Sequence, residues 1–464
     1  MTPPAELSLW ETTGPRVALA PGGRRRSPFR EETDLRLSTF TADAAAALPG
    51  PGWLRAGRAA AFERLAGSEL PTDAEEVWRY SRIGELDLEA YSPSAAPPGV
   101  LAGLPSELQA VVDCVPERAG LLVVHNGRVS HVELDQALAA RGVVLAPIGA
   151  AASGGELLGS VAAPGDVFVD LNTAFMAEGT LVQVPAGVAV GGPILVVHWV
   201  DCDGGAVFPR LVVRTGEASQ VTVLEQLASP SSVSAFVAPV VELDAADASN
   251  LALLGLQQLG PRVWQVGYQA SRVGRDATLT SALVALGGHY ARVRTDSRLA
   301  GQGGTSNLVA AYFGDSEQMH DFRTLQDHEG PKTMSDLLFK GAVQDHSHSV
   351  YSGLIRVRHG AAGTNAFQTN RNLVLAKGAH ADSVPNLEIE ENDVRCSHAS
   401  AVGPVDEDQR YYLEARGVPP EVAERLIVLG FFDEVIDRTP IPGLRRPLRR
   451  ALADKLHGPQ PQAS

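Results

Sequence analysis

Cysteine is scarce in this sequence. The chain has 464 residues but three cysteines, Cys114, Cys202 and Cys396, which lie far apart in the sequence. Three scattered thiols exclude a disulfide framework and a zinc site built from closely spaced cysteines. Such cysteine usage is typical of a protein that works in a reducing compartment, so we expect a cytoplasmic location.

Long hydrophobic runs and excess positive charge are also missing. The longest apolar candidate, residues 193–200, contains His198 and falls well short of the roughly 18 residues that a membrane-spanning helix needs. Three arginines at positions 24–26 would suit a twin-arginine signal, but charged residues follow where an apolar segment should begin. The net charge of −15 argues against duplex nucleic acid, because an acidic surface repels phosphates. We therefore expect no membrane and no nucleic acid among the partners.

Helical signals are present towards the N-terminus. Residues 40–65 are rich in alanine and predict helix, with a break at a Pro-Gly-Pro sequence. Thr72, followed three residues later by Glu75, has the spacing of a capping box and predicts the start of another helix. Apolar residues on either side of Asn126 and Gly127 predict a β-hairpin.

The middle of the chain has a different pattern. Between about residues 159 and 400 the helical period disappears, and short apolar bursts follow one another with Gly, Asp, Asn or Pro in most gaps. Because no helices are available for crossovers, this pattern argues against a doubly wound α/β fold. A sandwich or barrel of this length would be unusual, whereas in a coil of stacked strands each turn buries its inner side chains on the next. We therefore predict a mainly β protein with a β-helix core.

These signals divide the chain into four parts. The first part is rich in Pro, Gly and Arg and has no hydrophobic period, which predicts a mobile tail. The predicted parts are the mobile tail, residues 1–38; a mainly helical region with a short hairpin, residues 39–158; the β-helix core, residues 159–400; and a C-terminal helical region, residues 401–464.

Two helices are predicted in the C-terminal region. The first runs from Glu407 to Arg416 and ends before Gly417, which suits a helix C-terminus. A pair of prolines opens the second helix, whose apolar residues recur every three or four positions and form one face. That face packs either on the parent domain or on a partner, and the pattern alone favours the parent domain. Its apolar residues are Val422, Leu426, Leu429, Phe432 and Ile436.

Cys396 and His398 are the first candidate site. They stand two residues apart on the last strand-like segment, so their side chains should point to the same face. A thiolate beside an imidazole can hold a transition metal or an iron–sulfur species. The alternative is a buried cysteine beside a structural histidine, and the pair alone favours that alternative.

Two further motifs could in principle bind a metal ion or a nucleotide. His346 and His348 would project their rings to one side of a strand as a metal pair, but the spacing supplies no third ligand, and surface or interface histidines are favoured. The glycine-rich residues 301–304 are followed by no Walker lysine, so we expect no nucleotide to be bound by this chain.

The C-terminal motifs together resemble the SufB/SufD family of iron–sulfur cluster assembly scaffold proteins, in particular its D-type (SufD) members. The resemblance covers roughly residues 160–440. Its residues are the sequence Asp393-Val394-Arg395-Cys396-Ser397-His398, then Gly403, Asp406, Tyr412-Leu413 and Arg416-Gly417, with upstream matches at Lys340-Gly341, Tyr351 to Val357, Gln368, Asn370, Asn372-Leu373 and Pro385 to Ile389.

The resemblance implies a right-handed parallel β-helix core with N-terminal and C-terminal helical segments. It implies a scaffold, and no enzyme, that pairs with a B-type subunit through the β-helix and binds an ABC-type ATPase on its C-terminal helices. A transient iron–sulfur cluster would form at the interface with the B-type subunit, with His398 as the main ligand from this chain and Cys396 as a second candidate. Reduced flavin on the complex and a homodimer of the isolated chain are options that it leaves open. The implied ATPase-binding residues are Val422, Leu426, Leu429 and Phe432.

Two departures favour a D-type over a B-type chain. Ala379 stands near the position of the B-type cysteine, and Cys-Ser-His replaces a His-Glu pair. A cluster usually needs about four ligands, so this chain should not hold one alone. The alternatives from other classes are a polysaccharide-active β-helix enzyme, for which no acidic groove is identifiable, and a structural β-solenoid without a metal role.

Overall fold

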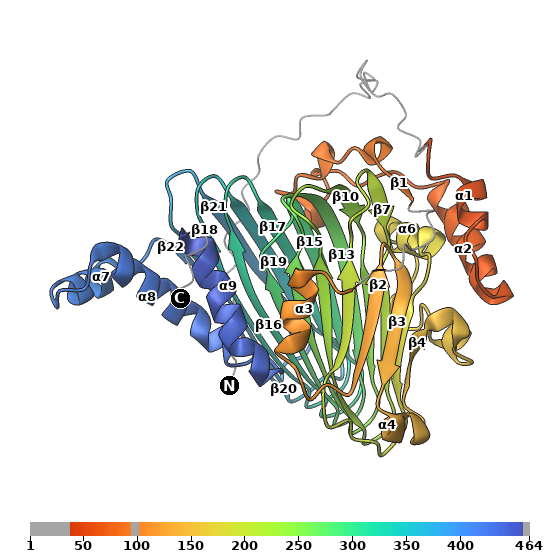
Figure 1. The fold of residues 1–464 in the computed structure, drawn as a ribbon. Helices are drawn as coiled ribbons and strands as arrows, with labels where there is room; N and C mark the ends of the chain where they lie inside the picture. Colours follow the sequence, from red (N-terminus) through yellow and green to blue (C-terminus); the bar gives the residue numbers. More distant parts are fainter. Residues whose placement is uncertain (1–37, 94–100, 102, 458–464) are drawn as a thin grey trace, which may run out of the picture.

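The structure is a computed structural model, which describes residues 38–93, 101 and 103–457. The predicted mobile tail therefore lies outside the described residues, apart from Ser38. A stack of strands forms the body, with helices at both of its ends (Figure 1). Within the described residues the α-helices are α1 Ala42–Ala46, α2 Gly52–Leu65, α3 Ser106–Asp113, α4 Gln136–Ala140, α5 Gly154–Leu157, α6 Val167–Phe175, α7 Glu407–Glu414, α8 Pro420–Ile436 and α9 Arg445–His457.

The strands form two sheets that face each other. The twelve-stranded sheet has the order β21-β19-β17-β15-β13-β11-β8-β5-β4, with β1, β7 and β10 beside it. Its strands are β1 Ser92–Pro93, β4 Val144–Pro147, β5 Thr180–Val184, β7 Gly205–Val207, β8 Arg210–Thr215, β10 Ser234–Val237, β11 Val240–Ala245, β13 Arg262–Val273, β15 Tyr290–Leu299, β17 Met319–His328, β19 His348–Val357 and β21 His380–Ile389.

The ten-stranded sheet has the order β22-β20-β18-β16-β14-β12-β9-β6-β2-β3. Its strands are β2 Gly120–His125, β3 Arg128–Leu134, β6 Ile194–Trp199, β9 Gln220–Ala228, β12 Asn250–Gln258, β14 Thr278–Ala285, β16 Thr305–Gly314, β18 Met334–Val343, β20 Thr364–Val374 and β22 Val394–Gly403.

Successive strands from β11 to β22 alternate between the two sheets. Strand β13 also pairs with β10. Every pair along the two sheet paths is parallel, except the antiparallel pairs β2 with β3 and β4 with β5. Tyr290 pairs with Met319, Met319 with His348, and His348 with His380. One turn of the coil thus stacks on the next in register, which confirms the predicted parallel β-helix core.

A loop at the same position of consecutive coils contains one residue in the left-handed backbone conformation. Seven residues in consecutive coils have φ between 52° and 77°, and the N–H of each donates a hydrogen bond to a carbonyl one coil further on. Glycine adopts this conformation without strain, but alanine, aspartate and lysine also occupy it here. The backbone conformation therefore repeats from coil to coil, although the residue type at this position does not. The seven residues are Gly187, Ala218, Ala248, Asp276, Gly303, Lys332 and Gly363.

The N-terminal region folds partly as predicted. The interrupted helix is present as α1 and α2, and Asn126 and Gly127, both with positive φ, connect the strands of the hairpin β2–β3. Helix α6 was not predicted, because residues 159–179 were assigned to the β-helix core. Nearly all of α6 is buried, so it lacks the polar face that makes a helical period visible. The first core strand is β5.

The helix predicted after Thr72 is wrong. Only a single 3₁₀ turn forms, Glu76–Trp78, although the Glu75 carboxylate does accept a hydrogen bond from the Thr72 N–H at 3.1 Å. The segment instead lies extended against the solenoid. The guanidinium of Arg292 lies 3.7 Å from the centre of the Trp78 ring, and Arg323 donates to the backbone carbonyl of Arg79 at 2.6 Å. These tertiary contacts outweigh a local capping signal, which is worth about 1 kcal/mol.

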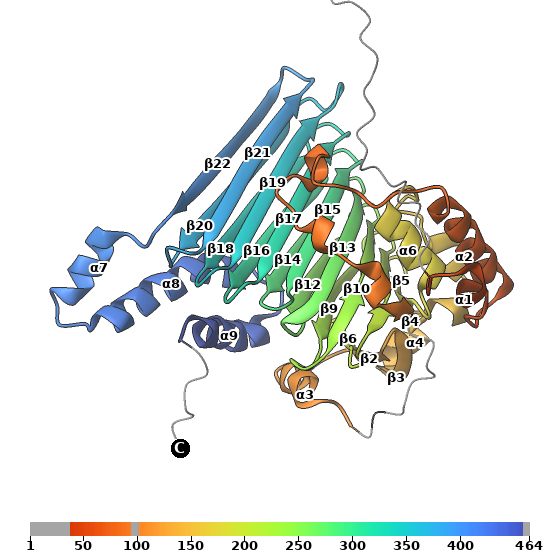
Figure 2. The same ribbon diagram turned by 90° about the horizontal axis from the view of Figure 1, so that it is seen from above.

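Helices α8 and α9 cover the outer face of the ten-stranded sheet near β16 and β18 (Figure 2). Phe432 packs on Phe313 with ring centres 6.2 Å apart. The buried Lys340 donates from Nζ to the Phe431 carbonyl at 2.8 Å and pairs with Glu434 at 2.7 Å. These contacts fix the C-terminal half of α8 to the core.

Two histidines inside the solenoid are held neutral by burial. Burial lowers the pKa of His320 to about 3 and that of His328 to about 4. His328 has a hydroxyl partner on each ring nitrogen, Thr333 at 2.8 Å and Ser335 at 2.9 Å. Both imidazoles therefore remain unprotonated in the folded chain at neutral pH.

This burial predicts a loss of stability in mild acid. Below pH 6.5 the unfolded chain binds protons that the folded chain cannot, so the free energy of unfolding should fall from pH 6.5 towards pH 4. His328→Gln should make the slope between pH 6.5 and 5 shallower, by up to about 1.4 kcal/mol per pH unit. Urea denaturation at a series of pH values measures this slope. His131→Gln, at an exposed site, is the control, and an equal change in both variants would contradict the prediction.

Candidate functional site

The last coil, made of β21 and β22, carries the predicted Cys–His pair. Cys396 pairs with Ala366 of β20, and His398 pairs with Gln368. The hydroxyl of Ser400 donates to that of Ser383 in β21 at 2.8 Å, across the two sheets. Because side chains alternate along a strand, Cys396 and His398 point to the same side as Ser400, between the sheets.

The two side chains differ in exposure. Cys396 is half-buried and packs near Ile355, Val357 and Leu387. Burial raises the pKa of its thiol, so the thiolate that would bind metal is disfavoured at neutral pH. His398 is exposed and, within the described part of the chain, its ring makes no hydrogen bond or ion pair. Of the two, His398 is the ligand that is already available.

The structure does not bring a second thiol to this pair. Ala379 precedes β21 and packs with Val343 and Ala381. Cys114 caps α3, and Cys202 follows β6, at a distance of many strands along the sheet. Among the described residues, none of the three cysteines forms a disulfide. Among the described residues, the inner side of the last coil therefore offers one cysteine, Cys396, and one histidine, His398.

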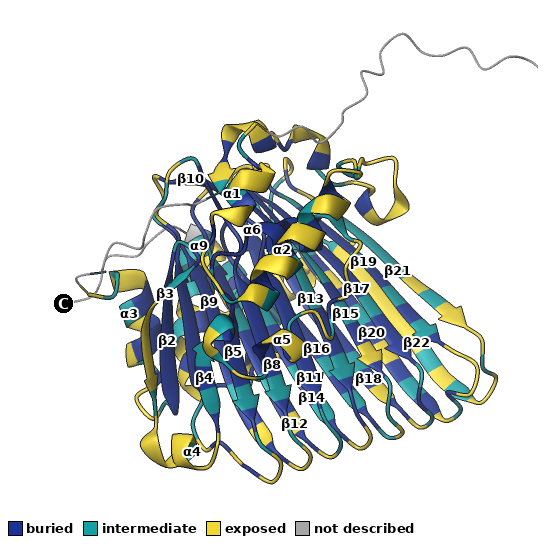
Figure 3. Ribbon diagram, turned by 90° about the vertical axis from the view of Figure 1, so that its right-hand side faces the viewer, coloured by how far each residue is buried: buried dark blue, intermediate teal, exposed yellow. Residues whose placement is uncertain are grey.

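Strands β21 and β22 form the open edges of both sheets. They are the terminal strands of the two sheet paths, and exposed residues become more frequent towards them (Figure 3). Three large apolar side chains near this end are 43–44% exposed: Phe367, Ile389 and Val402. Unpaired edge strands with apolar neighbours are templates for pairing with another chain.

Helices α7 and α8 form a second exposed apolar surface. Figure 2 shows α7 projecting away from the stack of strands. Tyr411 and Tyr412 of α7 are 73% and 56% exposed, and Leu426 and Val422 of α8 are 52% and 41% exposed. We call these four residues the α7–α8 patch. Exposed large apolar side chains gathered on neighbouring helices make this surface a candidate interaction site.

Only part of the apolar face of α8 that was predicted to bind a partner is exposed. Val422 and Leu426 are exposed, whereas Leu429 packs against the core cluster and Phe432 is fully buried in it. Phe432 is therefore corrected from a partner-binding residue to a core residue of this chain. Ile436 is buried with it. The parent domain covers the C-terminal half of the face and leaves the N-terminal half free.

His346 and His348 do not lie side by side on one strand, as the predicted metal pair would require. His346 lies in the turn before β19, whereas His348 begins that strand and faces residues of β21. His348 stands in register with His380, and the carboxylate of Asp382 contacts both rings. Spacing along the chain does not indicate this group, because His348 stands 32 positions before His380 and 34 before Asp382.

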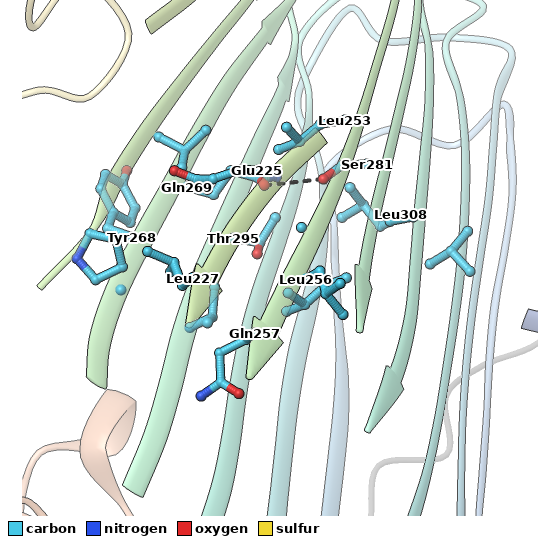
Figure 4. A pocket seen from close by; sticks show the side chains of 18 of the residues that line it. Glu225, Leu227, Leu253, Leu256, Gln257, Tyr268, Gln269, Ser281, Thr295 and Leu308 are labelled. Atoms are coloured by element: carbon cyan, nitrogen blue, oxygen red, sulfur yellow. Dashed lines mark hydrogen bonds between the residues drawn. The ribbon is translucent and has the colours of Figure 1, made fainter. Parts of the chain in front are cut away.

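A mostly apolar pocket with several polar side chains lies between the sheets in the middle of the core (Figure 4). Its lining includes Gln257, Gln269 and Ser281, and the Ser281 hydroxyl donates to the Gln269 side-chain carbonyl at 3.1 Å. The carboxylate of Glu225 lies 3.5 Å from His198 Nε2. The described residues that line this pocket include no cysteine, so it lacks the thiolates of a cluster site.

The last coil lies within a region that matches a known protein family. Residues 198–431 match the family model described as the SufBD core domain of the SUF system for iron–sulfur cluster assembly. The chain belongs to the SufBD family of iron–sulfur cluster assembly proteins. The match spans most of the solenoid, the Cys–His pair and much of α8.

Relatives named for the same function match over long stretches. An iron–sulfur cluster assembly SufBD family protein of Mycobacterium tuberculosis is 35% identical over 300 residues, which are 62% of this chain and 72% of the relative. The iron–sulfur cluster assembly protein SufD of Bacillus subtilis is 28% identical over 415 residues, 88% of this chain and 94% of the relative. SufD of Escherichia coli is 27% identical over 297 residues, 63% and 70% of the two chains. These matches confirm the resemblance to D-type members.

Among the described residues, no helix is long and apolar enough to cross a membrane.

Proposed function

We propose that this chain is the D-type scaffold subunit of a cytoplasmic Suf-type complex that builds iron–sulfur clusters. In this proposal it pairs with a B-type subunit through the open end of the solenoid, and an ABC-type ATPase binds the α7–α8 patch. The chain acts as a scaffold, and ATP hydrolysis belongs to the partner. The observation that carries the proposal is the exposed imidazole of His398 on the edge strand of a SufBD family protein.

The ligand count supports an interface site. A cluster needs about four ligands, mostly thiolates, and the last coil offers His398 and a half-buried thiol with a raised pKa. The remaining ligands would come from a partner chain that pairs with β21 or β22. The cluster is then cargo that is completed only when the two chains meet.

The open edges suit such a partner. Main-chain groups of an added strand or sheet would satisfy the unpaired N–H and C=O groups, and Phe367, Ile389 and Val402 would lose their exposure. A homodimer would cover the same edges. A partner with a cysteine opposite His398 is favoured because a second copy brings Ala379 instead.

The test of the proposal is His398→Ala in the assembled complex. We expect the variant to form the heterodimer normally, because the side chain is exposed and makes no intrachain bond among the described residues. Iron and acid-labile sulfide per complex after anaerobic reconstitution should fall severalfold. Cys396→Ala should have a smaller effect, since its thiol is partly buried.

Ser397→Ala is the matched control, because Ser397 is also exposed and points to the opposite side of β22. If His398→Ala complexes form in equal yield and load iron and sulfide like the wild type, His398 is structural and a solenoid without a metal role is favoured. The same result would reject the interface site.

A further inference from the structure

The outer face of the twelve-stranded sheet carries a second group of metal-ligand residues, separate from His398. His348 begins β19 and His380 begins β21, and the two are in-register neighbours. Asp382 follows two residues after His380 and therefore points to the same face. Ser383, the next residue, points inward to Ser400, so the group lies on the opposite face of the last coil from the Cys–His pair.

The three side chains converge on a common point. His348 Nε2 lies 2.8 Å from Asp382 Oδ2, and His380 Nε2 lies 3.3 Å from Asp382 Oδ1. The centres of the two imidazole rings are 5.1 Å apart. One ligand atom from each residue falls within 4.8 Å of the others. Ligand atoms at about 2.0–2.1 Å from one ion are about 3.3 Å apart, so small side-chain rotations would suffice.

The surroundings suit a cation that remains open to exchange. The side chain of His380 is 67% exposed, whereas those of His348 and Asp382 are 23% and 24% exposed. Arg82 is a nearby positive charge, but its guanidinium is engaged with the Glu317 carbonyl at 2.8 Å.

We propose that His348, His380 and Asp382 form a binding site for a divalent first-row transition-metal ion. Two imidazoles and one carboxylate are a ligand set used for Fe²⁺ and, with an open fourth position, for Zn²⁺. The proposal does not rest on the Suf complex, because all three ligands belong to this chain and lie away from His398. In the metal-free state the Asp382 carboxylate is hydrogen-bonded to the His348 ring and lies 3.3 Å from His380 Nε2.

The experiment uses the full chain without a polyhistidine tag, titrated with Co²⁺ as a spectroscopic probe and with Zn²⁺ by calorimetry. We expect one equivalent of metal to bind and visible Co²⁺ bands of a site with nitrogen and oxygen ligands. His380→Ala and Asp382→Asn should each weaken binding by more than about tenfold. Both side chains lie at the surface of the last coil, so the fold should be retained, which circular dichroism will check.

Two controls make the assignment specific. His346→Ala removes a histidine from the turn next to the site, and His398→Ala removes the one on the opposite face; both should leave the affinity unchanged. Absence of stoichiometric binding by the wild type, or equal affinity in the His380→Ala and Asp382→Asn variants, would overturn the proposal. Loss of binding in His398→Ala alone would place the metal at the Cys–His pair instead.

Discussion

Replacing Asp321 by alanine is expected to lower the free energy of unfolding by about 3–5 kcal/mol, because it breaks a buried ion-pair network. The carboxylate is fully buried and accepts hydrogen bonds from Tyr290, Arg292 and Arg323 at 2.8, 2.6 and 2.6 Å. Burial alone would raise the pKa of Asp321, but the two guanidinium groups hold it below its ordinary value. Without the carboxylate, two buried positive charges lose their partner.

The effect should extend to the N-terminal segment. Arg292 donates to the Val77 carbonyl at 2.7 Å, and its guanidinium lies over the Trp78 ring. Arg323 holds the Arg79 carbonyl. We therefore expect Asp321→Ala to loosen the segment around Trp78, with a change in tryptophan fluorescence.

Urea denaturation followed by circular dichroism and fluorescence measures the loss. Asp336→Ala is the control, because Asp336 also pairs with an arginine, Arg438 at 2.8 Å, but both groups are exposed. A surface pair of this kind is worth about 0–1 kcal/mol. Equal losses in the two variants would show that the Asp321 network contributes no more than a surface pair.

The second large effect is expected at the α7–α8 patch. The double change Val422→Asp and Leu426→Asp should weaken binding of the ABC-type ATPase roughly a hundredfold or more, because each apolar side chain would be replaced by a carboxylate that binding must desolvate. The free energy of unfolding should hardly change, since both positions are exposed. Co-purification and calorimetric titration with the ATPase measure the affinity.

Phe432→Ala is the contrasting variant. It should cost about 3–5 kcal/mol of stability by leaving a cavity beneath α8, and it should affect the ATPase only through that loss. Leu429 is unsuitable for the test because it packs against the core. Undiminished ATPase binding by the double aspartate variant would reject the patch as the docking surface.

Short sequence patterns were sufficient to predict the structural elements that depend on a few neighbouring residues. Asn126 and Gly127 set the hairpin turn, Gly417 with a φ of 84° follows α7, and the run of short apolar bursts indicated stacked strands. The Cys–His pair and its flanking motif were sufficient to indicate the SufBD family. In each case the signal itself lies within a short stretch of the chain, so the sequence shows it directly.

Tertiary structure decided where contacts between distant segments were needed. Burial on all sides hid α6, and arginines from β15 and β17 held the segment after Thr72 out of a helix. The apolar face of α8 looked uniform, but docking on β16 and β18 buried Phe432 and left Leu426 free. The stacking register placed His348 beside His380, thirty-two positions further on. Composition and spacing determined the repeating strands, but only the register between coils determined which side chains share a site, because that register depends on turn lengths that no local pattern specifies.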